Sequence, residues 1–338
     1  MHFLGKTGCF HGIKVSKKAF QKYNSGVKVG LKNKKILITG GAGFIGAALG
    51  NKLSKDNTVI ALDNLSSGDW NRCSDLIHKH TIDLVNSKVE DIQRYFESVD
   101  YVFHFSASKL NSENKNIELM LQNNMNASLK VFTASGLSGV QKVIFSSSLY
   151  SYGSYGPGPM EEKNISHPDT FYGLTKFFGE QLLSLEAHKY NFQFVNARLF
   201  FIYGPHQYAD GGYKSVIIKN FENIKNGKPV TIYGSGEQAL DYVYIDDCIE
   251  SLIQLAGSDF SGLVNISSGK PITVLELIHK MNQLTDSKEI DFLPADWTDG
   301  TIRFGLNNKL KSIIGWAPAT KIEFGLKKTF ESLNVGRI

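Results

Sequence analysis

The fold class of this chain is decided by residues 35–46, Lys35-Ile36-Leu37-Ile38-Thr39-Gly40-Gly41-Ala42-Gly43-Phe44-Ile45-Gly46. The first five residues form a short run that is mostly apolar and branched, which is typical of a short buried strand. Glycines follow at once and permit a tight turn in which backbone N–H groups can approach a phosphate. Residues 47–55 then have the pattern of a helix. Strand, glycine turn and helix in this order predict a dinucleotide-binding unit, with its pyrophosphate at Gly40, Gly43, Phe44, Ile45 and Gly46.

An acidic residue supports the same interpretation. Asp63 stands 20 residues after Gly43, at the end of the second expected strand, 58–62. A carboxylate at this place accepts hydrogen bonds from ribose hydroxyls and repels a 2′-phosphate. The residues therefore predict NAD rather than NADP as the cofactor.

The alternation of strand and helix continues to about residue 200. Further apolar strands are expected at 101–105, 142–145 and 192–200, and helices at about 115–136 and 171–190. Continuous apolar strands between helices predict a doubly wound α/β fold, in which a parallel Rossmann sheet is covered on both faces.

Beyond Phe201 the pattern changes to short elements between glycine and proline turns, with two helices near 274–284 and 322–333. Because an open α/β sheet binds its ligand at the carboxyl ends of its strands, we expect a smaller, discontinuous C-terminal α/β domain over that edge. The expected division is a basic arm at 1–33, an NAD-binding domain at 34–200 joined by a segment at about 237–266, and a substrate domain at 201–236 and 267–338.

Charge is distributed unevenly along the chain. The 338 residues contain 37 lysines and arginines and 32 acidic residues, a net charge of +5. Residues 1–33 hold seven lysines and no acidic residue or arginine, so the remainder has 30 basic against 32 acidic residues. We therefore expect no nucleic-acid partner for the body. The arm is expected to pack on the body or on a partner subunit, with contact to an anion or a membrane surface as the alternative.

Cysteine usage and hydropathy exclude other classes. The three cysteines, Cys9, Cys73 and Cys248, are scattered and form no CxxC pair. We expect reduced thiols in a cytoplasmic protein and no metal site. No apolar run reaches the roughly 18–20 residues that span a bilayer, so no membrane span is expected.

A second constellation consists of Ser148, Tyr172 and Lys176. The tyrosine and the lysine are four residues apart at the start of an expected helix and share one face. A phenol with a pKa near 10 acts as an acid/base at neutral pH only when its phenolate is stabilised. The Lys176 ammonium, together with the positive nicotinamide of NAD, is expected to lower the pKa of Tyr172. Ser148, after a separate strand, is expected to orient a substrate hydroxyl.

Taken in order, these motifs carry a family resemblance over about residues 34–335. The chain resembles the extended short-chain dehydrogenase/reductases, in the branch of NAD-dependent nucleotide-sugar epimerases and dehydratases. Besides the glycine loop, the matching segments are Leu62-Asp63-Asn64-Leu65-Ser66-Ser67-Gly68, Asp83-Leu84, Val102-Phe103-His104-Phe105-Ser106-Ala107, Asn124, Ser146-Ser147-Ser148, Tyr172 to Lys176, Arg198 through Tyr203-Gly204-Pro205, Asp241 to Asp247 and Gly315-Trp316-Ala317-Pro318.

The resemblance implies further site residues and a partner. Asp63 and Asn64 would hold the adenosine ribose, Asp83 and Leu84 would flank the adenine, and Lys109 would contact the dinucleotide. The remaining implied cofactor residues are Ser66, Gly68, Phe105, Ser106, Ala107, Asn124, Ser146, Tyr172 and Lys176. The expected substrate contacts are Ser148, Tyr150, Phe201, Val216, Tyr233 and Leu240. The resemblance also implies a homodimer that pairs the helices near 115–136 and 171–190.

The resemblance narrows the reaction as well. Dehydratases of this family place Asp-Glu directly after the catalytic serine or threonine, and decarboxylases usually keep the glutamate. This chain has Leu149 and Tyr150 there, so elimination lacks its acid/base pair. The expected activity is that of an isomerase, a nucleotide-sugar 4-epimerase. Tyr172 takes the C4 hydroxyl proton while NAD takes the hydride, which then returns to the other face of the 4-keto sugar. A 4-ketoreductase would use the same residues with resupplied reduced cofactor.

Three positions depart from the family pattern. Phe201 replaces the usual asparagine, and Leu240 and Asp296 stand where arginines are usual; in the family all three places hold the substrate's diphosphate. Lys214, His206, Arg303 or a lysine of the arm are candidates to supply the lost charge. Two alternatives therefore stay open. One is another NAD-dependent oxidoreductase or epimerase on an atypical sugar, cyclitol or glycoside without a diphosphate. The other, more remote, is a non-catalytic NAD-binding sensor.

Overall fold

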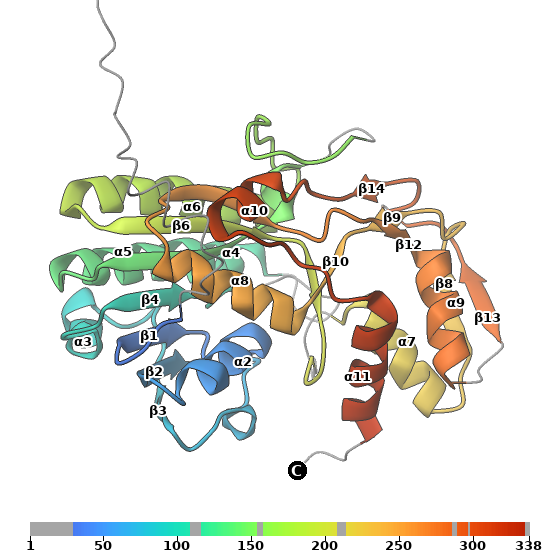
Figure 1. The fold of residues 1–338 in the computed structure, drawn as a ribbon, viewed down its shortest axis with the longest axis horizontal. Coiled ribbons are helices and arrows are strands. Elements are labelled where there is room, and N and C mark those ends of the chain that lie inside the picture. The colour runs from blue at the N-terminus through green and yellow to red at the C-terminus, as the bar shows by residue number, and fades with distance from the viewer. Residues whose placement is uncertain are drawn as a thin grey trace, which may run out of the picture.

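The structure is a computed structural model that describes residues 30–108, 116–153, 158–207, 214–285, 289–296 and 298–334. A larger part built on one parallel sheet lies beside a smaller part formed by later residues (Figure 1). Among the described residues, no helix combines the length and the apolar character that crossing a membrane requires.

The central sheet has seven strands, all parallel to their neighbours. In spatial order they are β11 (Gly262–Ile266), β6 (Gln193–Leu199), β5 (Lys142–Ser148), β4 (Tyr101–His104), β1 (Lys35–Thr39), β2 (Thr58–Asp63) and β3 (Ile77–Thr81). Strand β1 pairs with both β2 and β4, so the sheet grows outward from β1 in two directions. The residues that follow β1 and β4 therefore leave the sheet side by side, which is where such a fold binds ligands. The doubly wound fold predicted from the sequence is confirmed.

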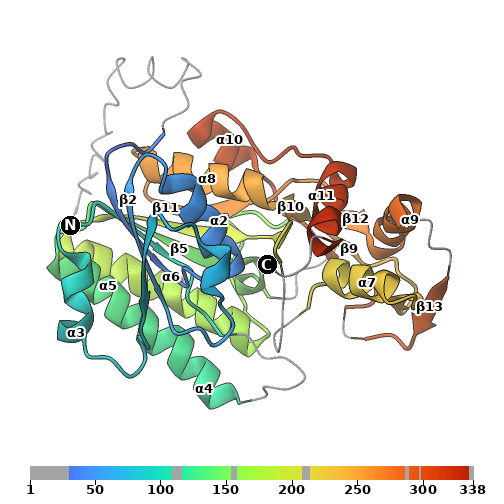
Figure 2. The ribbon, with the colours of Figure 1, turned by 90° about the horizontal axis from the view of Figure 1, so that it is seen from below.

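Helices cover both faces of this sheet (Figure 2). One face carries α2 (Phe44–Leu53) and α8 (Ile245–Gly257), and the other carries α3 (Val89–Gln93), α5 (Ala127–Leu137) and α6 (Phe171–Tyr190). Because successive strand residues point to opposite faces, Ile36 and Ile38 belong to one buried cluster and Leu37 to the other. This two-sided burial explains why the strands are apolar throughout.

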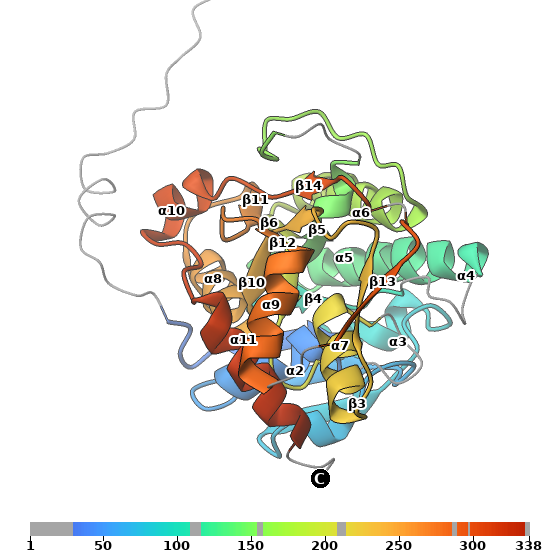
Figure 3. The ribbon, with the colours of Figure 1, turned by 90° about the vertical axis from the view of Figure 1, so that its right-hand side faces the viewer.

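The smaller part is assembled from short elements (Figure 3). Its helices are α7 (Val216–Lys225), α9 (Val274–Thr285) and α11 (Ile322–Asn334), while α10 (Asn308–Ile314) packs on α8 and β11. Its strands form three small sheets: β8 (Val230–Tyr233) with β13 (Ile290–Leu293), β7 (Phe201–Tyr203) with β10 (Tyr242–Tyr244), and β9 (Ala239–Leu240) between β12 (Ile272–Thr273) and β14 (Ile302–Arg303). The domain boundaries given from the sequence stay a prediction.

Two helices differ from their expected bounds. The helix expected at 47–55 is α2, which begins at Phe44 because Gly43 is its N-cap. The helix expected at 115–136 consists of α4 (Ile117–Leu121), a π-helical turn η3 (Gln122–Asn126) and α5. The π turn directs Asn124 into the protein, where it is 3% exposed.

Candidate functional site

The glycine loop after β1 is shaped by close backbone approaches. Gly40 has a φ of +68°, and a Cβ there would lie 2.7 Å from the backbone N of Ser106. A Cβ on Gly46 would lie 2.1 Å from the Gly40 carbonyl oxygen, so only glycine lets α2 pack this closely on the loop. At Gly43 the nearest such atom is 3.2 Å away, and no side chain caps the N-terminus of α2. The loop and the first turn of α2 therefore offer backbone N–H groups to an anion.

Asp63 joins the end of β2 to this loop. Its carboxylate accepts hydrogen bonds from the backbone N–H of Ala42 (3.0 Å) and of Leu65 (2.8 Å). Each carboxylate oxygen has a second lone pair, so the same group can still accept a ribose hydroxyl. A Cβ on Gly68 would lie 2.8 Å from the Asp63 Oδ1, which explains the glycine there. Asn64 and Ser66 are exposed beside it.

Other residues expected to touch the cofactor are held by the protein itself. The Asn124 amide donates to the Ser108 carbonyl (2.9 Å) and to Thr175 Oγ1 (3.0 Å), and its oxygen accepts from Ser108 N (2.6 Å). These bonds hold the segment after β4, and a contact of Asn124 with the cofactor stays a prediction. Ser146 Oγ likewise donates to the His104 carbonyl at 3.1 Å.

The residues expected at the adenine end of the cofactor are also in contact with the rest of the protein. The Asp83 carboxylate accepts from Val85 N at 2.9 Å, and Leu84 is buried in the core, so their contact with the adenine stays a prediction. Phe105, Ser106 and Ala107 follow β4 and are half-buried next to the glycine loop. Lys109, as well as residues 1–29 of the basic arm, lies outside the described residues.

The three expected catalytic residues come from β5 and α6. Ser148 is the last residue of β5, and its Oγ accepts from Tyr150 N at 3.3 Å. Tyr172 lies in the first turn of α6, which Thr170 caps through its bond from Gly173 N (3.0 Å). The buried Lys176 Nζ is 5.8 Å from the Tyr172 ring centroid.

Two aromatic residues stand beside this group. The Tyr150 ring centroid is 6.1 Å from that of Tyr172 and 6.4 Å from that of Phe201. The structure thus brings together Tyr150, Tyr172, Lys176 and Phe201 at the carboxyl ends of β5 and β6.

The pKa of Tyr172 is raised, whereas the sequence predicts a lowered one. Burial of the phenol is the largest cause, and the neighbouring Tyr150 phenol adds to it. The Lys176 ammonium alone does not reverse this effect, so in the protein by itself Tyr172 is a protonated phenol. The expected lowering relied on two positive charges, and the second one belongs to the nicotinamide of the cofactor.

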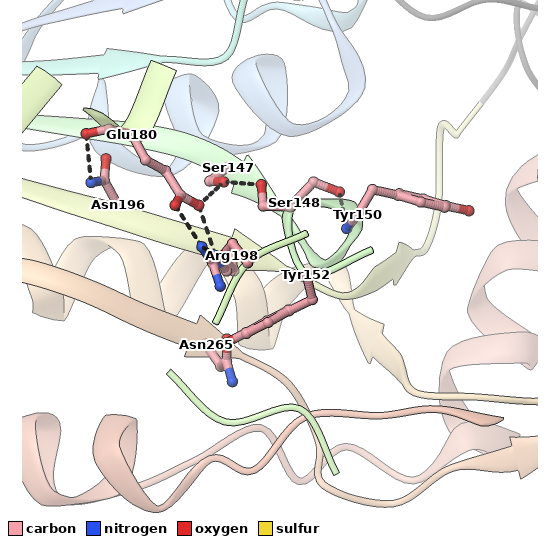
Figure 4. Close-up of polar contacts among 10 residues, drawn as sticks. Ser147, Ser148, Tyr150, Tyr152, Glu180, Asn196, Arg198 and Asn265 are labelled. Atoms are coloured by element: carbon pink, nitrogen blue, oxygen red, sulfur yellow. Dashed lines mark hydrogen bonds and ion pairs between the residues drawn. The ribbon is translucent and has the colours of Figure 1, made fainter. Parts of the chain in front are cut away.

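A buried polar network lies next to Ser148 at the end of β5 (Figure 4). Glu180 of α6 and Arg198 of β6 form a double ion pair, Nε–Oε1 at 2.7 Å and Nη2–Oε2 at 2.6 Å. Ser147 Oγ donates to the same carboxylate, and the guanidinium carbon lies 4.1 Å from the Tyr152 ring centroid. Sequence reasoning missed Glu180. Its signal was the spacing of Tyr172, Lys176 and Glu180, which puts all three on one face of α6.

The other expected substrate residues, Leu240, Val216 and Tyr233, lie on three different elements of the smaller part. Leu240, in β9, is in register with Arg303 of β14, whose guanidinium carbon is 5.5 Å from the Tyr150 ring centroid. Val216 begins α7, and Tyr233 ends β8, where its hydroxyl accepts from Lys219 Nζ at 2.9 Å. No sequence pattern predicted the contact of Arg303 with Tyr150.

Comparison with known proteins identifies the family. Residues 36–266 match the sequence profile of the NAD dependent epimerase/dehydratase family. The chain belongs to this family. One relative, named UDP-glucuronate 4-epimerase, from Thermodesulfobacterium geofontis, is 28% identical over 309 residues, which cover 87% of this chain and 94% of the relative.

Two solved structures of epimerases resemble this chain over most of its length. UDP-N-acetylglucosamine 4-epimerase from Methanobrevibacter ruminantium, in complex with UDP-N-acetylmuramic acid, has a TM-score of 0.85 and 30% identity, covering 90% of this chain and 99% of its own. UDP-glucose 4-epimerase from Thermotoga maritima with UDP-glucose has a TM-score of 0.82 and 31% identity, covering 89% and 98%.

The residues of this epimerase/dehydratase family member fit the NAD on which its family depends. No side chain caps the N-terminus of α2 after Gly43, so the N–H groups of its first turn can donate to a phosphate. The Asp63 carboxylate, at the end of β2, is at the place where a ribose is held in this fold.

Proposed function

We propose that this protein is an NAD-dependent nucleotide-sugar 4-epimerase that acts on a UDP-sugar. The observation that carries the proposal is the grouping of Tyr172, Lys176 and Tyr150 just beyond the end of β5, where Ser148 stands. The names of the three relatives described above support the substrate class, because each of them is named as a 4-epimerase of a UDP-sugar.

Each catalytic side chain has a role that follows from its chemistry. The Tyr172 oxygen would accept the proton of the sugar C4 hydroxyl and later return it. The Lys176 ammonium would stabilise the phenolate, and the Ser148 hydroxyl would hydrogen bond the C4 oxygen. NAD, held by the glycine loop and Asp63, would supply reversible hydride acceptance for C4. Because burial raises the pKa of Tyr172, its deprotonation requires these positive neighbours.

The residues after Ser148 favour epimerisation over elimination. Leu149 is buried and apolar, and Tyr150 presents a phenol ring to Tyr172. Removal of water between C5 and C6 requires an acid and a base at the sugar. A 4-epimerase needs only the groups at C4, and these are the groups that stand together here.

The test is epimerisation of UDP-glucose, UDP-galactose, UDP-N-acetylglucosamine and UDP-glucuronic acid by the purified protein, with the Tyr172→Phe variant alongside. We expect the variant to lose roughly 10²- to 10⁴-fold in kcat, since its ring has no acid/base group, while it binds NAD like the wild type. Tyr190→Phe, at the far end of α6, is the matched control and should remain active. Full activity of Tyr172→Phe, or no epimerisation of any of the four by the NAD-loaded wild type, would contradict the proposal.

We also infer that the protein is a homodimer formed through α4, α5 and α6. Large apolar side chains on these helices are exposed to water: Ile117, Leu119, Leu129, Leu137, Phe171, Leu174, Phe178 and Leu185. Leu174, Phe178 and Leu185 follow a spacing that puts them on one face of α6. Helices α5 and α6 pack against each other, so their exposed residues form adjoining rows. Such an apolar surface is typical of a protein interface.

We further propose a cytoplasmic location. Cys73 and Cys248 are free and buried, and burial is the largest cause that raises the pKa of the Cys73 thiol to about 11. Thiols kept reduced and unreactive are typical of a reducing compartment. Fractionation with an antibody to the protein tests this location.

A further inference from the structure

The substrate side of the catalytic residues is mostly aromatic and apolar. Tyr150 contacts Phe201 (6.4 Å between ring centroids), and Phe201 contacts Tyr242 (5.9 Å). Leu240, an expected substrate residue, is half-buried in β9. A nucleoside diphosphate sugar nevertheless carries at least two negative charges. The binding of such a substrate therefore requires a cation close to this wall.

Arg303 is a cation placed against the wall. It is 7% exposed, and its guanidinium carbon lies 5.5 Å from the Tyr150 ring centroid. The Tyr150 ring in turn contacts the ring of Tyr172. The N–H donors of a guanidinium lie in one plane, and two of them can bind the paired oxygens of an oxyanion with two parallel bonds.

The backbone holds Arg303 in this place. Strand β14 pairs in parallel with β9, so Arg303 and Leu240 are in register and lie on the same face of the small sheet. The Arg303 carbonyl accepts from Asp241 N at 3.0 Å. The next two residues are fixed as well, because the Phe304 carbonyl accepts from Met160 N (2.8 Å) and Gly305 N donates to the Asp241 carboxylate (3.2 Å). Residues 303–305 make all of these bonds through main-chain atoms, so a change of the Arg303 side chain leaves the bonds intact.

The other candidate cations are arranged differently. Lys214 forms an ion pair with Glu222 at 2.7 Å near the surface. His206 is exposed in the turn after β7, and the lysines of the arm up to residue 29 lie outside the described residues. Of these side chains, Arg303 is the one that is buried beside Tyr150.

We propose that Arg303 is a specificity-determining residue that binds an oxyanion of the substrate beside Tyr150. The inference rests on the proposed function, since it takes the substrate to be a UDP-sugar. A diphosphate and the carboxylate of a uronic sugar present the same chemistry, a pair of oxygens that matches the guanidinium fork. Arg303 then supplies the positive charge that Leu240 and Asp296 do not.

The test compares wild type, Arg303→Met and Arg303→Lys in the NAD-loaded protein. Calorimetry measures the binding of uridine, UDP, UDP-glucose and UDP-glucuronic acid, and kinetics measures kcat and KM for the two sugars. Arg303→Met removes the charge at similar length, and Arg303→Lys keeps the charge without the fork. Arg94→Met is the matched control, because Arg94 also lies over a tyrosine ring, Tyr95 at 4.9 Å, but outside the site. Unchanged NAD content and thermal unfolding show that each variant is folded.

The expected result is a loss of roughly 10- to 100-fold in affinity for Arg303→Met, a smaller loss for Arg303→Lys and none for Arg94→Met. Weaker binding of UDP, with uridine unchanged, assigns the diphosphate as the oxyanion. Unchanged UDP with a higher KM for UDP-glucuronic acid alone assigns the sugar carboxylate.

Two results would overturn the inference, and they are distinguishable. If the wild type epimerises a UDP-sugar and Arg303→Met stays within twofold for every ligand, Arg303 binds no substrate oxyanion and the proposed function stands. If the wild type neither binds UDP nor turns over any UDP-sugar, the proposed function fails and the role of Arg303 fails with it.

Discussion

His104, at the end of β4, joins the glycine strand to helix α5 through both ring nitrogens. Its Nδ1 is 2.6 Å from Thr39 Oγ1, and its Nε2 is 2.9 Å from Ser128 Oγ. Ser128 donates its own hydrogen to the Asn124 carbonyl, so it must accept from His104. The proton therefore lies on Nε2, and Nδ1 accepts from Thr39. Burial lowers the pKa of His104 to about 3, and the Lys176 ammonium adds to the effect.

Because His104 is buried in its neutral form, we expect the protein to lose stability in mild acid. Its folded pKa lies below the ordinary 6.5, so between pH 6.5 and 3 the unfolded chain binds the extra proton. The contribution of His104 to the free energy of unfolding is fully present above pH 6.5 and is lost as the pH falls. At pH 5 the loss from this residue is about 2 kcal/mol. Chemical unfolding of wild type and His104→Gln at pH 7.5 and 5 measures it. The variant should lose less on acidification. His78→Gln removes an exposed imidazole as control. Equal acid losses in all three proteins would rule the effect out.

At the residue scale, what the sequence could predict depended on how local the signal was. The glycine loop and Asp63 could be located because their roles are set by a few neighbouring residues. The roles given to Ser148, Tyr172 and Lys176 stay predictions. The contacts of Asn124 and Arg303 could not be seen, since they are made with Ser108, Thr175 and Tyr150, which are distant in the chain.

At the scale of elements, α6 and β6 are joined by the Glu180–Arg198 pair. Both side chains are buried, at 3% and 1% exposure, and Arg198 also donates to Ser166 Oγ at 2.8 Å. Ser147, next to Ser148 at the end of β5, donates to Glu180, so the pair also links the helix that carries Tyr172 to this strand end. It therefore holds the two halves of the catalytic group in one arrangement.

Removal of one partner should be costly, and removal of both much less so. Arg198→Met leaves the Glu180 carboxylate buried without its counter-ion, so we expect a loss of about 3–5 kcal/mol in the free energy of unfolding. The double variant Glu180→Met/Arg198→Met should recover most of that loss, because no unpaired charge remains. Urea unfolding measures both. Lys214→Met breaks a surface pair with Glu222 and should cost no more than about 1 kcal/mol. A double variant as unstable as Arg198→Met would refute this account.

Elements with a strong pattern were predicted better than short ones. Helix α6 spans the expected residues because Thr170 caps its start and Asn191 ends it in the left-handed conformation. Strand β3, Ile-His-Lys-His-Thr, was not expected. It lies at the sheet edge, where Ile77 alone is buried, so no apolar run marks it. The two-residue strands β9 and β14 exist only through their pairing and leave no sequence pattern.

At the scale of the whole molecule, the chain completes the sheet late. It leaves after β6, builds the smaller part, and returns through α8 to β11 at the sheet edge. Lys142, at the start of β5, ties this return segment down by donating to the Leu255 and Ser258 carbonyls at the end of α8. The sheet end of the site is thus built by early residues, whereas Arg303 and Leu240 come from late ones. Such a site forms only when both parts are folded together.

The face formed by α4, α5 and α6 gives the last prediction, which concerns assembly. Leu174 and Leu185 are 45% and 67% exposed on α6, and Leu129 is 42% exposed on α5. Sedimentation should find the wild type at twice the 37.5 kDa of one chain. The double variant Leu174→Glu/Leu185→Glu would bury four charges at a symmetric interface. We therefore expect the dissociation constant of the dimer to rise by roughly 30-fold or more, equivalent to about 2 kcal/mol. Phe324→Glu changes an exposed apolar residue of α11, far from this face in the fold, and should remain dimeric (Figure 1). A monomeric wild type, or equal dissociation of both variants, would show that this face is not the interface.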